Sequence, residues 1–220
     1  MTLETTPLGT VRGTTIPNSA DSSQSDLAIT PRGDLVVAHG LPELAELVRH
    51  GGSWQIIGAA TAALTAVPTT TAGHSLWNGE TGATGKVYVI DSFGVVEIIT
   101  DATQQNSLAL FAAMEAGEFT APTDAGLTKA SLSGRVAGGT SARTVAGATV
   151  AGVWTPHGPS APGATAFAGA VWRVHEFQAK GLYLVRPKGL FSIAAAKTVA
   201  TASQLRYFIR WHEVLLPYVA

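Results

Sequence analysis

A period-two pattern near the C-terminal end of the chain constrains the fold more than any other feature. Between residues 204 and 214 the side chains at odd positions are mostly large and apolar, whereas most of the charged side chains are at even positions. Successive side chains of a strand point to opposite faces, whereas a helix would scatter these residues around its axis, so the pattern predicts a strand with one face on a core. The apolar parity is Leu205, Tyr207, Ile209 and Trp211, and the other parity is Arg206, Phe208, Arg210 and His212.

Two shorter apolar runs, residues 182–185 and 190–193, precede that strand and are separated by Pro187 and Gly189. Three strand candidates with turn residues between them predict a β-meander at this end of the chain. A meander with one apolar face needs further sheet to pack against, so the rest of the chain must supply it.

The rest of the chain does carry further short strand-like runs separated by turn residues. Gly94 lies inside one of them and predicts a bulge or a turn there, whereas residues 155–162 read as a proline-rich loop. Residues 41–50 predict one short helix, with Pro42 near its start and Gly51 and Gly52 able to end it. The runs are residues 27–30, 34–38, 54–60, 64–67, 75–78, 87–100, 107–116, 127–132, 138–153 and 167–177.

Eight to ten short strands with one minor helix predict an all-β fold, an antiparallel β-sandwich or single jelly roll. Residues 1–25 are rich in Thr, Ser and other small polar residues and poor in large apolar side chains, so they cannot offset their ordering entropy alone. We therefore expect an extended or disordered N-terminal arm at 1–25 and a β-sandwich domain at 26–220. The β-branched content of the arm would suit a strand added to a neighbouring subunit.

Charged residues make up 13% of the 220 residues, about half of the roughly 25% that is usual in soluble domains. Such a surface favours close contacts between subunits. The net charge of −1 and the scattered basic residues argue against a nucleic-acid partner, and no apolar window is long enough to predict a membrane partner. The absence of cysteine excludes disulfides and thiolate metal sites, and we expect no secretory signal.

No catalytic, cofactor-binding or metal-binding residue can be assigned from the pattern, so we expect no enzyme and no cofactor. Histidines at 39, 50, 74, 157, 175 and 212 favour surface or interface positions over a metal site. The adjacent pairs His175-Glu176 and His212-Glu213 point to opposite faces of their strands and cannot share one ligand. A joint site of His175 and His212 would need their two strands to be neighbours.

Other chemical motifs also favour structural interpretations. No G-x-S-x-G is present, and the carboxylates Asp91, Glu97, Glu115 and Glu118 show no spacing that indicates glycosidase chemistry. The glycines at 79, 82 and 85 before Lys86 do not match a phosphate-binding loop and predict a connection between two strands. Arg32-Gly33-Asp34 is best explained as a turn. The tryptophans at 54, 77, 154, 172 and 211 favour a core or a subunit contact over a sugar-binding platform.

Two stretches resemble small phage and environmental-virus structural proteins with a single jelly roll of the tumour-necrosis-factor-like type. One is His74-Ser75-Leu76-Trp77-Asn78 with its glycine-rich loop and residues 86–90. The other is residues 181–189 with Arg210-Trp211-His212-Glu213-Val214 near the end, and together they cover about a quarter of the chain. The resemblance implies a capsid, decoration or spike subunit that assembles as a trimer or pentamer and is anchored to other virion proteins by its N-terminal arm.

We therefore expect a structural subunit that self-assembles in a virion or similar extracellular assembly after synthesis in the cytoplasm. An alternative is an extracellular filament or surface-layer subunit, in which the N-terminal segment completes the sheet of the next subunit. A second alternative is a lectin-like carbohydrate-binding module that uses loop aromatics such as Tyr183 or Trp154.

Overall fold

The computed structural model describes residues 48, 51–81, 85–99, 108–115, 117–134, 139–159, 171–197 and 204–215. All of them lie in the second of two units into which the chain divides, residues 45–220. The runs predicted at 1–25, 27–30 and 34–38, and most of the helix predicted at 41–50, fall outside the described residues. Val48 is helical, and its carbonyl accepts a hydrogen bond from the Gly51 amide at 3.0 Å, where Gly51 adopts a φ of 78°. A glycine in that left-handed conformation commonly ends a helix.

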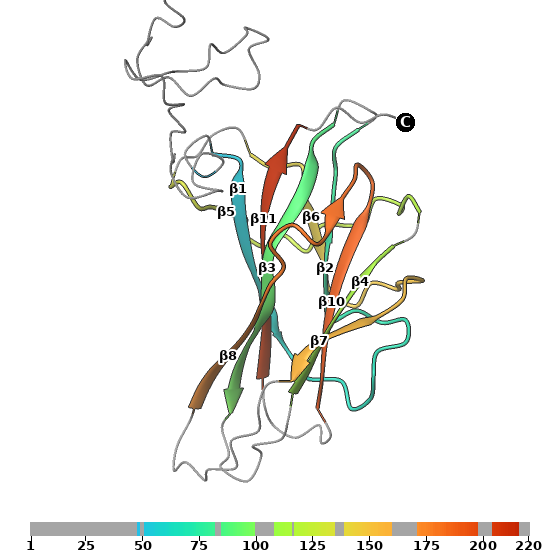
Figure 1. The fold of residues 1–220 in the computed structure, drawn as a ribbon, viewed down its shortest axis with the longest axis vertical. Coiled ribbons are helices and arrows are strands. Elements are labelled where there is room, and N and C mark those ends of the chain that lie inside the picture. The colour runs from blue at the N-terminus through green and yellow to red at the C-terminus, as the bar shows by residue number, and fades with distance from the viewer. Residues whose placement is uncertain are drawn as a thin grey trace, which may run out of the picture. The chain divides into compact units, whose positions relative to one another are not determined.

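The described part of the chain forms two antiparallel sheets (Figure 1). The first sheet has the order β5-β1-β11-β3-β8, with β9 also paired to β3, and the second has the order β6-β2-β10-β4-β7. The strands are β1 Ser53–Thr61, β2 His74–Trp77, β3 Val87–Ile99, β4 Leu108–Met114, β5 Ala130–Ser131, β6 Arg143–Val145, β7 Thr155–Pro159, β8 Val171–Gln178, β9 Leu184–Val185, β10 Leu190–Lys197 and β11 Gln204–Val214.

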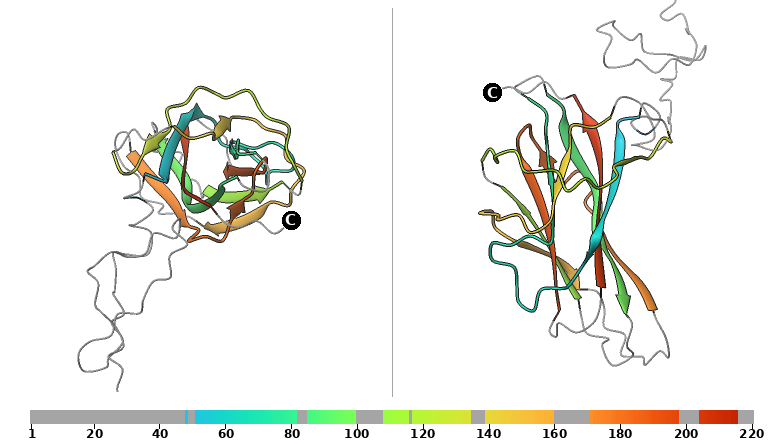
Figure 2. Two further views of the ribbon diagram at one scale, coloured as in Figure 1. Left: turned by 90° about the horizontal axis from the view of Figure 1, so that it is seen from above. Right: turned by 180° about the vertical axis from the view of Figure 1, so that it is seen from behind.

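Strand pairing follows a nested pattern. The pairs β1 with β11, β2 with β10, β3 with β8 and β4 with β7 are all antiparallel. The strands of the first half of the domain therefore pair, in reverse order, with those of the second half, as in one long hairpin. Two further pairings, β11 with β3 and β10 with β4, roll this long hairpin into two facing layers (Figure 2). Eight strands wound in this way form a jelly roll, which confirms the all-β sandwich predicted from the sequence.

The predicted C-terminal meander is wrong, although its strands exist. Here β9 pairs with β3, β10 pairs with β2 and β4 in the second sheet, and β11 pairs with β1 and β3 in the first. Alternation shows that one face of a strand meets a core, but it carries no information about which strand lies alongside. β10 is buried on both faces along its whole length, which its small-residue sequence allows.

Several boundaries also differ from the prediction. The sequence predicts a loop at residues 155–162, yet β7 occupies Thr155–Pro159, because prolines are tolerated on an edge strand. The run at 127–132 reduces to β5, and the strand pair predicted at 138–153 reduces to β6 and a single bridge at Thr149. Leu64 forms only an isolated bridge to Ala196. Among the described residues no helix is long and apolar enough to cross a membrane.

The main core fills the space between the sheets. The alternation in β11 is as predicted, because Leu205, Tyr207, Ile209 and Trp211 are all essentially buried and belong to one cluster. Phe208 and Arg210 belong to the opposite parity and point to the outer face of the first sheet. The Tyr207 hydroxyl reaches across the sandwich and accepts a hydrogen bond from the Ala195 amide of β10 at 2.9 Å. That contact ties the two sheets together by a polar bond as well as by packing.

A second, smaller apolar cluster covers the outer face of the second sheet. Trp77, Ala113 and Leu190 project outward from three strands of that sheet and are buried. The chain itself closes over them, with Val150 and Phe119 packed from connecting segments and Trp77 Nε1 donating to the Phe119 carbonyl at 3.1 Å. The second sheet is therefore covered on both faces.

Gly94 was predicted to mark a bulge or a turn, but β3 runs through it without interruption. The irregularity lies at Asp91 instead, because Trp211 pairs with Ile90 while Arg210 pairs with Ser92. At Gly94 a Cβ atom would lie 2.0 Å from the His175 carbonyl oxygen and 2.8 Å from the Phe208 ring. The glycine is required because the neighbouring strand and this ring approach the backbone closely.

Gly94→Ala is accordingly expected to destabilise the domain by about 1–3 kcal/mol, the usual cost of overpacking. Urea denaturation followed by tryptophan fluorescence measures the change. Gly117→Ala is the matched control, since nothing lies within 4 Å of its Cβ position. Equal stabilities for the two variants would contradict this account of Gly94.

Candidate functional site

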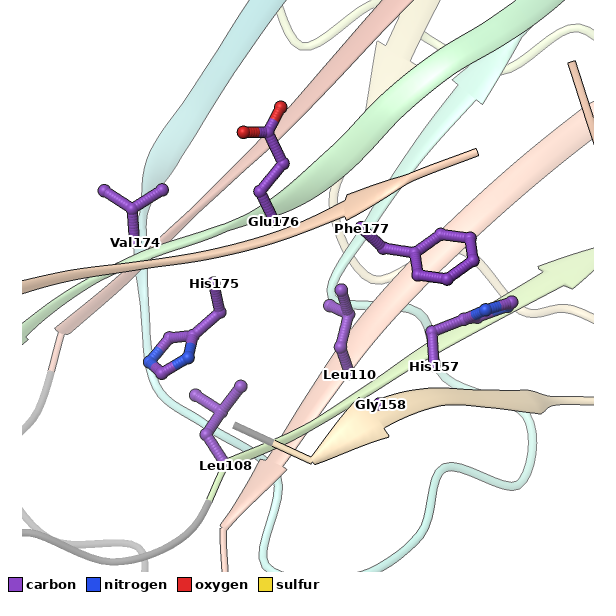
Figure 3. A pocket seen from close by; sticks show the side chains of 8 residues that line it. All are labelled: Leu108, Leu110, His157, Gly158, Val174, His175, Glu176 and Phe177. Atoms are coloured by element: carbon purple, nitrogen blue, oxygen red, sulfur yellow. The ribbon is translucent and has the colours of Figure 1, made fainter. Parts of the chain in front are cut away.

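A pocket opens at the edge of the sandwich where β8 and β7 face each other without pairing (Figure 3). Its volume is about 250 Å³. Three strands supply its walls, with side chains from β4 and β7 in the second sheet facing side chains from β8 in the first. The lining residues are Leu108, Leu110, His157, Gly158, Val174, His175, Glu176 and Phe177.

A buried charged cluster lies next to the pocket. Glu97 on β3 points inward, is fully buried, and accepts a hydrogen bond from Lys197 Nζ of β10. The second oxygen of the Glu97 carboxylate lies 3.3 Å from Nε2 of His175. Burial by itself would raise the pKa of Glu97, but the hydrogen bonds from His175 and Lys197 outweigh it and hold that pKa below its usual range. The cluster joins three strands from both sheets.

The other end of the pocket is aromatic. His157 is buried, and its Nε2 lies 2.5 Å from the Tyr183 hydroxyl. The imidazole of His157 packs on Phe177 with ring centroids 4.3 Å apart and on Phe93 at 5.3 Å. Burial lowers the pKa of His157, so the ring stays neutral at physiological pH. This wall is held by packing and by a hydrogen bond.

The arrangement suits binding an apolar group better than catalysis. His157 and His175 are each engaged with a partner of their own, Tyr183 and Glu97, and Leu110 lies between them in Figure 3. Within the described part of the chain, no group of three His, Asp or Glu side chains is placed to hold a metal ion. The remaining walls are the aliphatic and aromatic carbons of Leu108, Leu110 and Phe177.

One Ser-His-Asp arrangement was invisible in the sequence. Ser53 Oγ lies 2.6 Å from Nδ1 of His212, and Nε2 of the same ring lies 4.0 Å from Asp91 Oδ1. A nucleophilic serine must reach its substrate, but Ser53 is completely buried. The arrangement therefore stabilises the start of β1 against β11, where Ser53 and His212 are direct partners.

The predicted separation of the histidine pairs is confirmed. His175 points into the sandwich, whereas Glu176 points out of it and pairs with Arg210 at 3.0 Å. β3 lies between β8 and β11, so His175 and His212 cannot form one site. His74 is buried in the second sheet with its Nε2 unpartnered, and burial lowers its pKa to about 4. The histidines at 39 and 50 lie outside the described residues.

The four carboxylates considered for glycosidase chemistry lie in four different environments, each with its own partners. Glu97 belongs to the buried cluster and Asp91 faces His212. Glu115 accepts a hydrogen bond from the Ala151 amide at 3.0 Å, and Glu118 pairs with Lys188 at 3.1 Å. Glu118 and Lys188 also line a second pocket of about 390 Å³, together with the two aromatic rings that close the outer face of the second sheet.

The tryptophans divide between core and surface. Trp54, Trp77 and Trp211 are buried, as expected for core anchors, whereas Trp172 is 67% exposed. Trp154 is partly buried and donates to the Thr69 carbonyl, while the Tyr183 hydroxyl is engaged with His157. Trp154 packs against the outer cluster of the second sheet, and the Tyr183 ring packs against Phe93 and Phe191, so both rings are partly covered.

The connection between β2 and β3 is structural where it is described. Asn78 is fully buried, and its side-chain amide donates to the carbonyls of Lys86 and Val185, each at 2.8 Å. Lys86 itself forms an ion pair with Glu213 at 3.1 Å. Residues 82–84 of this loop lie outside the described residues.

Comparison with known proteins places the chain in no family. No family model matches it, and no curated protein matches its sequence. One solved structure similar to the chain is that of deformed wing virus carrying the GFP gene. The two chains are 8% identical, the alignment covers 96% of this chain and 94% of that chain, and the TM-score is 0.21. At that TM-score the two chains need not share a topology.

Proposed function

We propose that the protein is a non-enzymatic structural subunit of a virion, of the capsid, decoration or spike kind, that acts by assembling with copies of itself. The jelly roll is the architecture of many capsid domains, but it also serves lectins, so the fold alone does not decide the function. The observation that carries the proposal is an uncovered apolar band on the outer face of the first sheet.

Strand register defines the band. On that face Trp172 lies beside Ile98, and Val174 lies beside Val96 in the next row. The row after that runs from Glu176 through Gly94 and Phe208 to Ile57. Phe208 is buried, and the Arg210 guanidinium lies 5.7 Å from its ring centroid, so the exposed apolar surface is centred on β8. Trp172, Val174 and Ile57 are 67%, 63% and 53% exposed.

The two outer faces of the sandwich differ in a way that supports association. Connecting segments of the chain cover the second sheet, while the band on the first sheet leaves large apolar side chains in water. Neighbouring exposed apolar side chains such as Trp172 and Val174 commonly mark a protein interface. Tryptophan is among the residues that contribute most to binding at interfaces, so Trp172 is the expected anchor.

Replacing both Trp172 and Val174 by serine is expected to dissociate the assembly or to weaken it by at least about tenfold, because these two side chains would lose their burial between subunits. Size-exclusion chromatography with light scattering measures the mass as a function of protein concentration. The control is Val153→Ser, which removes an apolar side chain that is 86% exposed on a connecting segment. A wild-type protein that stays monomeric at micromolar concentration would contradict the proposed function.

The geometry of assembly distinguishes the virion role from a filament or surface-layer role. A symmetric ring closes on itself, whereas a head-to-tail contact that does not close produces a fibre. Negative-stain microscopy of the purified protein separates the two. Closed rings support the capsid, decoration or spike assignment, and long fibres would replace it by the filament.

A further inference from the structure

We propose that the edge of β8 remote from β3 accepts an extended strand, residues 8–16, from the N-terminal segment of a second copy of the chain, with Val11 inserted into the pocket between β8 and β7. This inference rests on the proposed self-assembly. It identifies the segment of one copy and the strand edge of another copy that form one of the contacts between them. It follows from a comparison of the four sheet edges, from the position of the pocket and from the sequence of the segment.

Three of the four sheet edges are poor templates for an added strand. β5 and β6 are two and three residues long, and short edge strands offer few hydrogen-bonding groups. β7 contains Pro156 and Pro159, which have no amide hydrogen, and Gly158 between them adopts a φ of 59°. Prolines on an edge strand are a common protection against pairing with another chain.

β8 is the edge without such protection. It is eight residues long, it contains no proline, and among the described strands it pairs with β3 alone. Its outward side chains include the exposed Trp172 and Val174. A strand added here would pair with the backbone of β8 and bury part of the apolar band at the same time.

The pocket lies directly under this edge. Every second side chain of a strand added to β8 would point into the gap between the sheets, where Leu108, Leu110 and Phe177 form the walls (Figure 3). A volume of about 250 Å³ is below the roughly 300–1,000 Å³ of small-molecule sites. It has room for an aliphatic side chain, and pockets for alternate side chains are how strand-adding proteins obtain specificity.

The sequence of the N-terminal segment matches this edge. Residues 8–16 are bounded by Pro7 and Pro17 and contain no proline, so their length is close to that of β8. On one parity Val11 is flanked by Gly9 and Gly13, which leaves one large side chain for one pocket. Residues 17–47 can span up to about 100 Å when extended, so a neighbouring copy is within reach.

Cross-linking between two single-cysteine variants tests the contact directly, because the chain has no cysteine of its own. With Val11 over the pocket, residue 12 points outward on the same face as Val174. A mixture of full-length Arg12→Cys and Val174→Cys proteins is expected to form an intermolecular disulfide on mild oxidation, visible on a non-reducing gel. The control mixture is Arg12→Cys with Val153→Cys, a position that is more exposed than Val174 and lies on the connection between β6 and β7, and we expect at least about tenfold less product from it.

Hydrogen exchange on the full-length chain provides the second readout. Val11→Asp places a charge at the pocket, so we expect those amides of residues 171–178 that point away from β3 to exchange at least about tenfold faster than in the wild-type assembly. Leu3→Asp, outside the proposed strand, should leave them unchanged. Equal cross-linking in the two mixtures, or exchange that Val11→Asp does not alter, would overturn the inference. If light scattering still finds an oligomer in that case, the proposed function survives it, whereas a wild-type monomer overturns both.

Discussion

Acidification from about pH 7.5 to about pH 5 should lower the free energy of unfolding sharply, because the native fold buries imidazoles that resist protonation. Burial lowers the pKa of His74 from 6.5 to about 4 and also lowers those of His157 and His212, the last of which Asp91 partly opposes. The unfolded chain therefore binds protons below about pH 6.5 that the folded chain does not bind. Stability falls as the pH falls wherever the unfolded state binds more protons, so the loss runs from about pH 6.5 down to about pH 4.

His74 alone is expected to contribute about 2 kcal/mol of this loss by pH 5. Glu97 and Asp124 do not contribute between about pH 7.5 and about pH 5, because their lowered pKa values add stability that is lost only below about pH 5. Urea denaturation at several pH values measures the effect.

A His74→Leu variant provides the control for the acid effect. Nε2 of His74 has no hydrogen-bond partner, so leucine removes the titration without breaking a bond at that atom. The number of protons bound on unfolding should decrease by about one. The slope of the free energy of unfolding against pH should therefore decrease by about 1.4 kcal/mol per pH unit. A wild-type stability that does not change between about pH 7.5 and about pH 5 would rule out this explanation, as would a His74→Leu variant with the wild-type slope.

Removing one partner of the buried ion pair is expected to have the second large effect. Lys197→Met leaves the Glu97 carboxylate buried with His175 and without its lysine, and breaking a buried pair in this way costs about 3–5 kcal/mol. Urea denaturation at neutral pH measures the loss. The double variant Glu97→Leu with Lys197→Met should regain most of it, because two apolar side chains of similar size need no compensating charge.

An exposed ion pair is the matched comparison. Glu118 and Lys188 are 3.1 Å apart with side chains 68% and 46% exposed, so Glu118→Gln should change the stability by less than about 1 kcal/mol. A Lys197→Met variant as stable as Glu118→Gln would mean that the pair between the sheets contributes little. A double variant less stable than Lys197→Met alone would mean that the charges themselves are required.

Both effects have consequences for assembly. The acid-sensitive His157 and the ion-pair partner His175 line the pocket at the edge of β8. If subunits associate at this edge, loss of local stability there should loosen the assembly before the whole domain unfolds. Light scattering over the same pH range, compared with the unfolding data, shows whether the assembly dissociates before the domain unfolds.

Local patterning was sufficient to predict the fold class and much of the core. The alternation in β11 identified correctly which of its side chains point inward, because a period of two is a property of the strand itself. Trp77 and Trp211 were predicted as core anchors on the same basis, and both are buried. The opposite orientations of His175 and Glu176 followed from the same geometry.

Strand pairing and the pocket were decided by tertiary structure alone. Nothing local distinguishes a meander from β10 and β11 lying in different sheets, since both arrangements bury the same side chains. Glu97 and Lys197 are 100 residues apart, and Ser53 and His212 are 159 apart, so no spacing in the sequence could reveal either contact. Propensity sets which residues form strands and which faces are apolar, whereas long-range packing selects the partner of each strand and the side chains that meet between the sheets.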